Sequence, residues 1–365
     1  MNITIRTDAS ISIGTGHVIR CLTLANKLRL RGNDIGFICR EESGNLIGLI
    51  QQNGYDVQLL PSGIDIDTDR NLTRILLEQT SPDWLIVDHY EIDAAWESSM
   101  RNAAGKIMVI DDLADRKHDC DLLLDQNYND DNKRYRQLVP DTCTMLLGPG
   151  YSLMRPQFAD VRTKIREHTG EIKRILIFMG GADPDNQTSE ALRAIKMLGR
   201  PDISTDLIIG ISNTNRSEIE SLASTLSNTS CYYNVENMAE LMNAADLCIG
   251  EGGTATWERC CLGLPSITVS IAENQISVVD NLVKSGAVVS AGWFRDITAK
   301  GLVGDLNFLL RHSGIVRQMS LKSQQLVDGK GTTRVVNCII NSPGPLLLRP
   351  ATLDDCFSVY DWRSH

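Results

Sequence analysis

The sequence has 365 residues, which is more than one hydrophobic core usually organises, so we expect two domains. Apolar residues make up 42% of the chain and charged residues 22%, as in ordinary globular proteins. The formal net charge of −10 argues against a general nucleic-acid-binding protein, which needs a basic surface to displace the counterions of phosphates.

The first part of the chain alternates short apolar runs with helical patterns, which is typical of βαβ units and a parallel sheet. It opens with a predicted strand at 2–6 and a helix at 16–31, whose apolar residues recur on one face from Val18 to Leu28. Further strands are predicted at 35–39, 56–60, 84–87, 107–110 and 121–124.

The pattern breaks over residues 128–172, which contain many Asn, Asp, Tyr and Arg residues. It restarts with a strand at 174–179 and a helix near 185–198, and residues 298–340 are expected to be largely helical. The remaining strands of this part are predicted near 205–210, 246–249, 265–269 and 287–290.

Two such halves predict an α/β fold of the GT-B type, in which two doubly wound Rossmann-like domains face each other across a cleft. We expect an N-terminal Rossmann-like domain at 1–145, an interdomain crossing at 146–172 and a C-terminal Rossmann-like domain at 173–340. Ligands of such sheets bind beyond the carboxyl ends of the strands, so the site should lie between the domains.

The last segment, 341–365, is predicted to be a linker followed by the truncated start of a further domain. Residues 346–355 resemble the first strand and turn of a GNAT-type N-acetyltransferase, which indicates a fused or neighbouring acetyltransferase domain as a partner. The segment contains no acetyl-CoA phosphate loop, so by itself it should not acetylate a substrate. The alternative is a C-terminal strand and helix that pack on the body of the protein.

No apolar run approaches the ~20 residues of a membrane-spanning helix, and the chain opens on a strand-like segment where a leader would stand. The ten cysteines are scattered and form no CxxC pair. We therefore expect a cytoplasmic protein with reduced thiols that has neither a membrane nor a nucleic acid as a partner.

The first motif that indicates chemistry joins the strand at 2–6 to the helix at 16–31. Gly14 and Gly16 allow a tight turn and the close approach of a ligand, and free amides at the helix N-terminus favour an anion. His17 follows in the first turn and is the candidate general base. The alternative is a histidine that only hydrogen-bonds the loop. The segment is not a Walker loop, so ATP hydrolysis is not indicated.

A second loop repeats this plan after the strand at 174–179. Gly180, Gly181 and Asp183 are predicted to contact a phosphate at the start of the next helix. The alternative is an ordinary turn between a strand and a helix.

A third loop is the richest in signals. Gly252, Gly253 and Thr254 are predicted to open a helix whose amides face a diphosphate. Glu258 lies one turn further, where a carboxylate can accept hydrogen bonds from both hydroxyls of a ribose. Glu251 is interpreted as a helix cap.

Asn274 and Gln275 begin another predicted helix on the cleft side. Their amides can donate hydrogen bonds to sugar hydroxyls or phosphate, or they are simple helix-start residues. With the second and third loops they complete the predicted nucleotide-binding set.

Other polar residues are rival candidates for a metal site or for the base. The adjacent Asp111 and Asp112 are interpreted as turn formers and not as metal ligands. The sequence has no HExxH motif and no Cys/His cluster, so it predicts neither a metal nor a cofactor. His89, at the end of the strand at 84–87, is a rival candidate for the base.

A set of short segments, taken together, is typical of one enzyme family. They are Arg6-Thr7-Asp8, Gly14-Thr15-Gly16-His17, Val87-Asp88-His89-Tyr90, Ile110-Asp111-Asp112-Leu113-Ala114, Gly180-Gly181-Ala182-Asp183 and Glu251-Gly252-Gly253-Thr254 with Glu258. Over roughly residues 1–340 the chain therefore resembles the UDP-2,4-diacetamido-2,4,6-trideoxy-β-L-altropyranose hydrolases of pseudaminic acid biosynthesis. That family is related to the GT-B glycosyltransferase that adds N-acetylglucosamine to the cell-wall lipid precursor, but this chain has one glycine fewer before His17.

The resemblance implies a UDP-amino sugar substrate, UDP held chiefly by the C-terminal domain, and His17 as the base that activates water. It also implies inversion at the anomeric carbon, no metal requirement, and a product used in flagellin glycosylation or surface polysaccharide. We expect Asp8 or a loop carbonyl to orient the ring of His17. Tyr90 and Asn127 are expected to contact the acetamido groups.

Three other functions remain open at this stage. A glycosyltransferase of the same fold would use an acceptor hydroxyl in place of water, although the sequence shows no basic cluster beside an apolar stretch for a membrane acceptor. A non-catalytic nucleotide-sugar binder would hold UDP without turnover. A hydrolysing 2-epimerase would change the configuration at C2.

Overall fold

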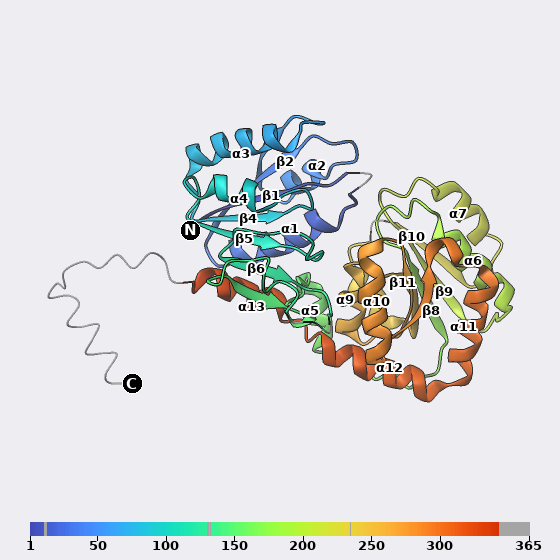
Figure 1. Cartoon of the computed structure of the whole chain (residues 1–365). Coiled ribbons are helices and arrows are strands. Elements are labelled where there is room, and N and C mark those ends of the chain that lie inside the picture. Colours follow the sequence, from blue (N-terminus) through green and yellow to red (C-terminus); the bar gives the residue numbers. More distant parts are fainter. Residues whose placement is uncertain (11–12, 130, 132, 234, 343–365) are drawn as a thin grey trace, which may run out of the picture.

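The computed structural model describes residues 1–10, 13–129, 131, 133–233 and 235–342. The acetyltransferase-like stretch predicted within 341–365 therefore lies outside the described residues, apart from the first two positions of its linker. The predicted α/β class is confirmed, because the described chain forms two parallel sheets, each covered by helices on both faces (Figure 1).

Within the described ranges, the first sheet has seven parallel strands in the order β3-β2-β1-β4-β5-β6-β7. These strands are β1 (Asn2–Thr7), β2 (Asp34–Arg40), β3 (Asp56–Leu60), β4 (Trp84–Asp88), β5 (Lys106–Ile110), β6 (Leu122–Asp125) and β7 (Thr144–Leu147). The helices between them are α1 (Gly16–Arg29), α2 (Ile47–Gln52), α3 (Ile66–Thr80) and α4 (Ala94–Met100). The order reverses between β1 and β4, where Thr7 pairs with Asp88.

The second sheet has the order β10-β9-β8-β11-β12-β13, again all parallel. Its strands are β8 (Arg174–Phe178), β9 (Ser204–Ile209), β10 (Thr229–Tyr233), β11 (Leu247–Glu251), β12 (Ser266–Ser270) and β13 (Val288–Trp293). Its helices are α6 (Gln187–Leu198), α7 (Arg216–Ala223), α8 (Met238–Ala244), α9 (Ala255–Leu262), α10 (Glu273–Ser285), α11 (Ala299–Arg311) and α12 (Ser313–Leu326), with η2 (Phe294–Asp296) after β13.

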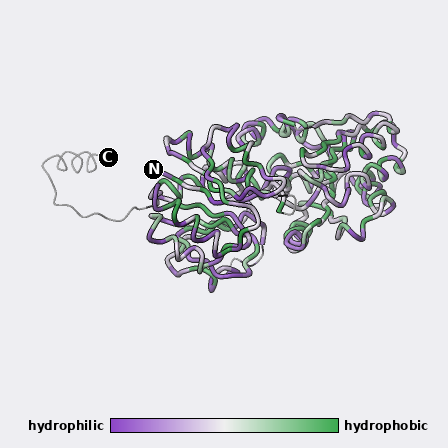
Figure 2. The backbone as a smooth tube through the Cα atoms, turned by 90° about the horizontal axis from the view of Figure 1, so that it is seen from above, coloured by the Kyte–Doolittle hydropathy of each residue, from purple (hydrophilic) through white to green (hydrophobic). Residues whose placement is uncertain are grey.

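Both sheets are buried on two faces, which explains why their strands are nearly continuous apolar runs. In β4, Ile86 packs into the cluster that contains α1, while its neighbours Leu85 and Val87 pack on the opposite face with α4. The predicted face of α1 is confirmed, because Val18 and Leu28 are both buried. Figure 2 shows hydrophobic segments running through the interior of both domains.

Two edge strands were not predicted. β7 lies where the sequence indicated only a break in the pattern, and β10 was not recognised. Both are partly exposed at the rim of their sheets, so they lack the apolar run that a doubly covered strand carries.

The crossing between the domains contains η1 (Pro149–Tyr151) and α5 (Pro156–Arg162), and the chain returns to the first domain at its end. The last described helix, α13 (Gly331–Ile340), lies beneath the first domain (Figure 1). Val336 and Ile339 are fully buried in the same core cluster as α1. The assignment of all residues to 340 to the C-terminal domain is therefore wrong for this helix, because its apolar face completes the N-terminal core.

No helix in the described part of the chain is both long and apolar enough to cross a membrane.

The close packing of α13 against the crossing can be tested at Gly331. A Cβ atom there would lie 2.3 Å from the carbonyl oxygen of Ser152, which is backbone and cannot move aside cheaply. Gly331→Ala should therefore lower the free energy of unfolding by about 1–3 kcal/mol, as overpacking does. Gly304→Ala is the control, since a Cβ at this exposed position of α11 meets no atom within 4 Å and should raise stability by up to about 1 kcal/mol. Urea unfolding measures both; equal effects would show that Gly331 is not tightly packed.

Candidate active site

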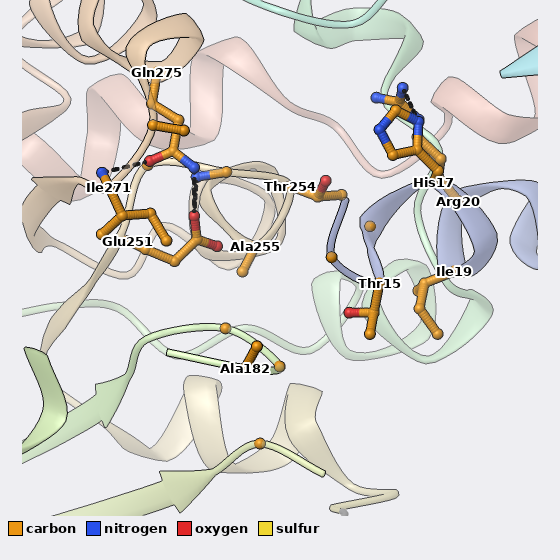
Figure 3. A pocket seen from close by; sticks show the side chains of 18 of the residues that line it. Thr15, His17, Ile19, Arg20, Ala182, Glu251, Thr254, Ala255, Ile271 and Gln275 are labelled. Carbon is orange, nitrogen blue, oxygen red and sulfur yellow. Dashed lines mark hydrogen bonds between the residues drawn. The ribbon is translucent and has the colours of Figure 1, made fainter. Parts of the chain in front are cut away.

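A cavity of about 760 Å³ lies between the two domains. It opens where the strand order reverses in each sheet, at β1 and β4 in the first and at β8 and β11 in the second. Such switch points are the usual ligand sites of doubly wound sheets. Figure 3 shows residues of the α1 loop facing residues of the second domain across this space.

Every residue that the sequence placed in the site lines this cavity. They are Asp8, Gly14, Gly16, His17, Tyr90, Asn127, Gly180, Gly181, Asp183, Gly252, Gly253, Thr254, Glu258, Asn274 and Gln275. Their contacts, however, differ in several cases from those expected.

His17 is the second residue of α1, and its ring is held by a carboxylate from the strand β4. The Nδ1 atom lies 2.5 Å from Oδ1 of Asp88, the last residue of β4. Arg20, one turn further along α1, donates to both oxygens of Asp88 at 2.6 Å and lies beside the ring (Figure 3). The three side chains form one charged unit at the cavity wall.

The charge state of Asp88 determines which nitrogen of His17 is free. Burial by itself would raise the pKa of Asp88, but Arg20 and His17 lower it well below its ordinary value. An ionised carboxylate can only accept, so Nδ1 of His17 carries the proton in this pair. In the neutral form of the ring, Nε2 is then the nitrogen without a proton, which is the tautomer that a general base requires.

Asp8 does not orient His17, contrary to the expectation. Its carboxylate accepts two hydrogen bonds from Arg6, at 2.7 and 2.8 Å, and one from the backbone amide of Arg40 at 2.7 Å. With Asp69 these residues form a buried charge cluster. The reason is strand pairing, because β1 lies beside β4 and it is Asp88 that ends β4 next to α1.

His89, the rival base, belongs to the same cluster. Its Nδ1 accepts a hydrogen bond from the backbone amide of Glu91 at 3.1 Å, so the proton resides on Nε2. That nitrogen faces Oδ2 of Asp8 at 3.1 Å. Nδ1 thus accepts a hydrogen bond, and the buried Nε2 lies at ion-pair distance from a carboxylate without forming a hydrogen bond to it, so the geometry favours His17 over His89.

Tyr90 and Asn274 meet across the cavity. The hydroxyl of Tyr90 accepts a hydrogen bond of 3.1 Å from the side-chain amide of Asn274 on α10. The ring of His17 packs edge-on against Tyr90, with centroids 4.5 Å apart. Burial raises the pKa of Tyr90 above its ordinary value, so the hydroxyl keeps its proton. Tyr90, predicted to contact the sugar, and Asn274, predicted to contact UDP, therefore lie next to each other.

The glycine-rich loops of the two domains approach each other closely. A Cβ atom on Gly181 would lie 2.8 Å from Oγ1 of Thr15, so a larger residue here would force the side chain of Thr15 or the loop to shift. Asp183, in the same loop, accepts hydrogen bonds from the amides of Gln187 and Thr188 at 2.8 and 3.0 Å. Its carboxylate caps α6, and the phosphate contact predicted for this loop stays a prediction.

In the loop before α9, side chains of the second domain already form hydrogen bonds with one another and with a loop amide. Glu251 accepts a hydrogen bond from the amide of Gly253, and it accepts another of 3.0 Å from Gln275. Gln275 in turn accepts from the amide of Ile271 at 3.0 Å (Figure 3). Gln275 thus links Glu251 to the backbone of Ile271 and stabilises the loop. Burial raises the pKa of Glu251, which favours its neutral form more than in water.

Glu258 lies on α9 and forms an ion pair with Arg155 of the crossing segment. Arg155 donates from Nε to Oε1 at 2.9 Å and from Nη2 to Oε2 at 3.1 Å. Both residues line the cavity. Arg155, Asp88 and Arg20 were not recognised as functional, since their partners are far along the chain and only the parallel pairing of β1 with β4 could have pointed to Asp88.

Asn127 lies at the cavity beside a carboxyl group of unusual pKa. Its backbone amide donates to Oδ1 of Asp125 at 2.9 Å. Burial raises the pKa of Asp125 to about 7, although Arg134 and the amide of Asn127 oppose that shift. No group of three or more His, Cys, Asp or Glu side chains among the described residues is arranged to hold a metal ion.

The state of His17 can be tested directly. In the wild-type protein, ¹⁵N chemical shifts of the neutral imidazole should show its proton on Nδ1, because Asp88 accepts there. In Asp88→Asn, that preference should weaken or reverse, since an amide can also donate. Selective ¹⁵N-histidine labelling gives the measurement, and an unchanged tautomer in the variant would contradict the assignment.

The carboxyl group of Asp125 should make stability depend on pH. Because its folded pKa of about 7 exceeds the ordinary value of 3.8, the folded state retains a proton that the unfolded state releases between these pH values. The protonated carboxyl group therefore contributes up to about 4 kcal/mol to the free energy of unfolding near pH 4, and this contribution is lost as the pH rises to about 7. Urea unfolding of the wild type and Asp125→Asn at both ends of this range should show the difference widening with pH; a constant difference would contradict it.

Comparison with known proteins is consistent with this geometry. Residues 174–293 match the glycosyltransferase family 28 C-terminal domain. The chain is 29% identical over 381 residues to an uncharacterized protein of Methanocaldococcus jannaschii, MJ1062, covering 100% of this chain and 73% of that protein. It is 28% identical over 290 residues to the UDP-2,4-diacetamido-2,4,6-trideoxy-beta-L-altropyranose hydrolase of Campylobacter jejuni, covering 78% of this chain and 97% of that protein.

The fold comparison covers nearly the whole chain. The crystal structure of MurG from Acinetobacter baumannii superposes with a TM-score of 0.66 at 14% sequence identity, covering 93% of this chain and 99% of MurG. The predicted GT-B fold is thereby confirmed, and its second domain carries the family 28 match.

Proposed function

We propose that this protein is a GT-B nucleotide-sugar enzyme that hydrolyses UDP-2,4-diacetamido-2,4,6-trideoxy-β-L-altropyranose. The products are UDP and the free sugar, with inversion at the anomeric carbon. The observation that carries the proposal is the His17–Asp88 pair at the interdomain cavity, which leaves Nε2 free to take a proton from water.

The comparisons support the choice of substrate. The similarity to the Campylobacter jejuni hydrolase covers 78% of this chain. The family 28 match covers the domain that would hold the nucleotide. The amides of the loop before α9, apart from that of Gly253, which donates to Glu251, would face the diphosphate, and Glu258 would accept the ribose hydroxyls. Asn274 and Tyr90, which meet in the cavity, would face the sugar.

The proposed step needs little more than water activation. The oxygen of water attacks the anomeric carbon while Nε2 of His17 takes one of its protons, and the bond from this carbon to the phosphate oxygen breaks with its electron pair on UDP. UDP leaves readily because a terminal phosphate has a second pKa of ~6. Asp88, already ionised, stabilises the imidazolium that forms, as the carboxylate of a catalytic triad does.

The decisive experiment uses the purified protein and the UDP-sugar without any acceptor, in ¹⁸O-labelled water. Release of UDP with ¹⁸O in the sugar, and an inverted anomer detected at early times by NMR, would support the proposal. Label in UDP would place cleavage at phosphorus and contradict it. UDP release only after an acceptor is added would indicate a glycosyltransferase, a changed C2 configuration a 2-epimerase, and binding without release a nucleotide-sugar binder.

His17→Asn should bind UDP with nearly wild-type affinity and lose about 10²–10⁴-fold in kcat, because general-base catalysis contributes that much. His312→Asn is the control, since His312 is exposed in the second domain. Steady-state UDP release and calorimetric UDP binding give the two quantities. Near-normal turnover in His17→Asn would remove His17 from the role of base.

A further inference from the structure

The crossing segment contributes Arg155 to the cavity, and this residue has no place in the mechanism above. Arg155 immediately precedes α5, which lies between the domains beside α9 (Figure 1). Its guanidinium forms a two-point pair with Glu258, as the distances of 2.9 and 3.1 Å show. The Glu258 side chain is only 10% exposed, whereas that of Arg155 is 29% exposed.

The backbone before Arg155 is fixed at several points. The amide of Leu153 donates to the side chain of Gln126 at 3.1 Å. Met154 forms two hydrogen bonds with the hydroxyl of Thr332 on α13, at 2.8 and 3.0 Å. The guanidinium itself lies over the ring of Phe158, 5.0 Å from its centroid. Arg155 is therefore held in place independently of any ligand.

The two hydrogen bonds from Arg155 determine which lone pairs of the Glu258 carboxylate remain available to a ligand. A carboxylate offers about four lone-pair positions, two on each oxygen. The paired guanidinium uses one position on each oxygen, so one remains on each. Two adjacent acceptors that share one negative charge match the two neighbouring hydroxyls of a ribose. Without Arg155, Glu258 would be a nearly buried charge with no cation beside it, and it would either rotate or take up a proton.

We propose that Arg155 is a positioning residue that makes the site selective for ribonucleotides, by orienting Glu258 toward the 2′- and 3′-hydroxyls. This inference rests on the proposed uridine nucleotide and extends it to a residue of the crossing. Arg155 acts through Glu258 and not on the phosphates.

The test compares the affinities of three probes by calorimetry: UDP, 2′-deoxy-UDP and uridine. The wild type should prefer UDP to 2′-deoxy-UDP by about 10–100-fold, the effect of one hydrogen bond to a charged group. Arg155→Met should reduce this preference to within about 3-fold and should also weaken uridine. Arg155→Lys should lie between, because an ammonium is a point charge and cannot pair at two points.

Arg162→Met is the matched control. Arg162 is the last residue of α5, the helix that Arg155 precedes, and donates to the carbonyl of Cys261 on α9, but it does not line the cavity. This variant should keep the wild-type preference, and thermal unfolding of all variants checks that they are folded. Combining Arg155→Met with Glu258→Gln should cost no more selectivity than either change alone.

The outcomes separate the two proposals. If Arg155→Met weakens UDP and 2′-deoxy-UDP equally and leaves uridine unchanged, Arg155 contacts phosphate and the inference is overturned. An unchanged UDP preference in a folded Arg155→Met protein overturns it as well. A wild-type protein that binds neither UDP nor uridine would contradict the proposed nucleotide itself.

Discussion

The carboxylate of Asp88 is the interaction on which the rest of the site depends. It is fully buried and accepts charge-assisted hydrogen bonds from His17 and from two nitrogens of Arg20. A buried charge of this kind is tolerated only when its partners are complete, so the three side chains have essentially one arrangement. That arrangement exists because β1 and β4 are parallel neighbours, which brings the end of β4 beside the start of α1.

The second domain completes what the first begins. Its loops after β8 and β11 lie opposite the α1 loop, and a hydrogen bond between Tyr90 and Asn274 joins the two sides next to His17. Asp183 and Gln275, both predicted to contact a ligand, also hold these loops in shape. In the proposed reaction, the first domain would orient the base, and the second would present backbone amides and acceptor side chains to the substrate.

Local sequence was sufficient for the central strands and for the loops of the site. Strands buried on both faces carry continuous apolar runs, and glycines followed by a helix mark the loops, so β1, β8 and β11 and their loops were found. The edge strands β7 and β10 were missed because half-exposed strands lack such runs.

The partners of the site residues were harder to predict than the residues themselves. Asp88 is 71 positions from His17 and Arg155 is 103 positions from Glu258, so these pairs arise only from strand order and from the path of the crossing. Asp8 is close to His17 in sequence, yet the two side chains belong to different clusters. Sequence distance was therefore a poor guide to which carboxylate orients the ring.

The most direct test of the account is a crystal structure of His17→Asn with the intact UDP-sugar bound. The account predicts that the anomeric carbon lies in the interdomain cavity, with a water molecule about 3 Å from both that carbon and the side chain at position 17, on the face opposite UDP. A sugar whose anomeric carbon points away from position 17, or a UDP bound outside the cavity, would contradict it.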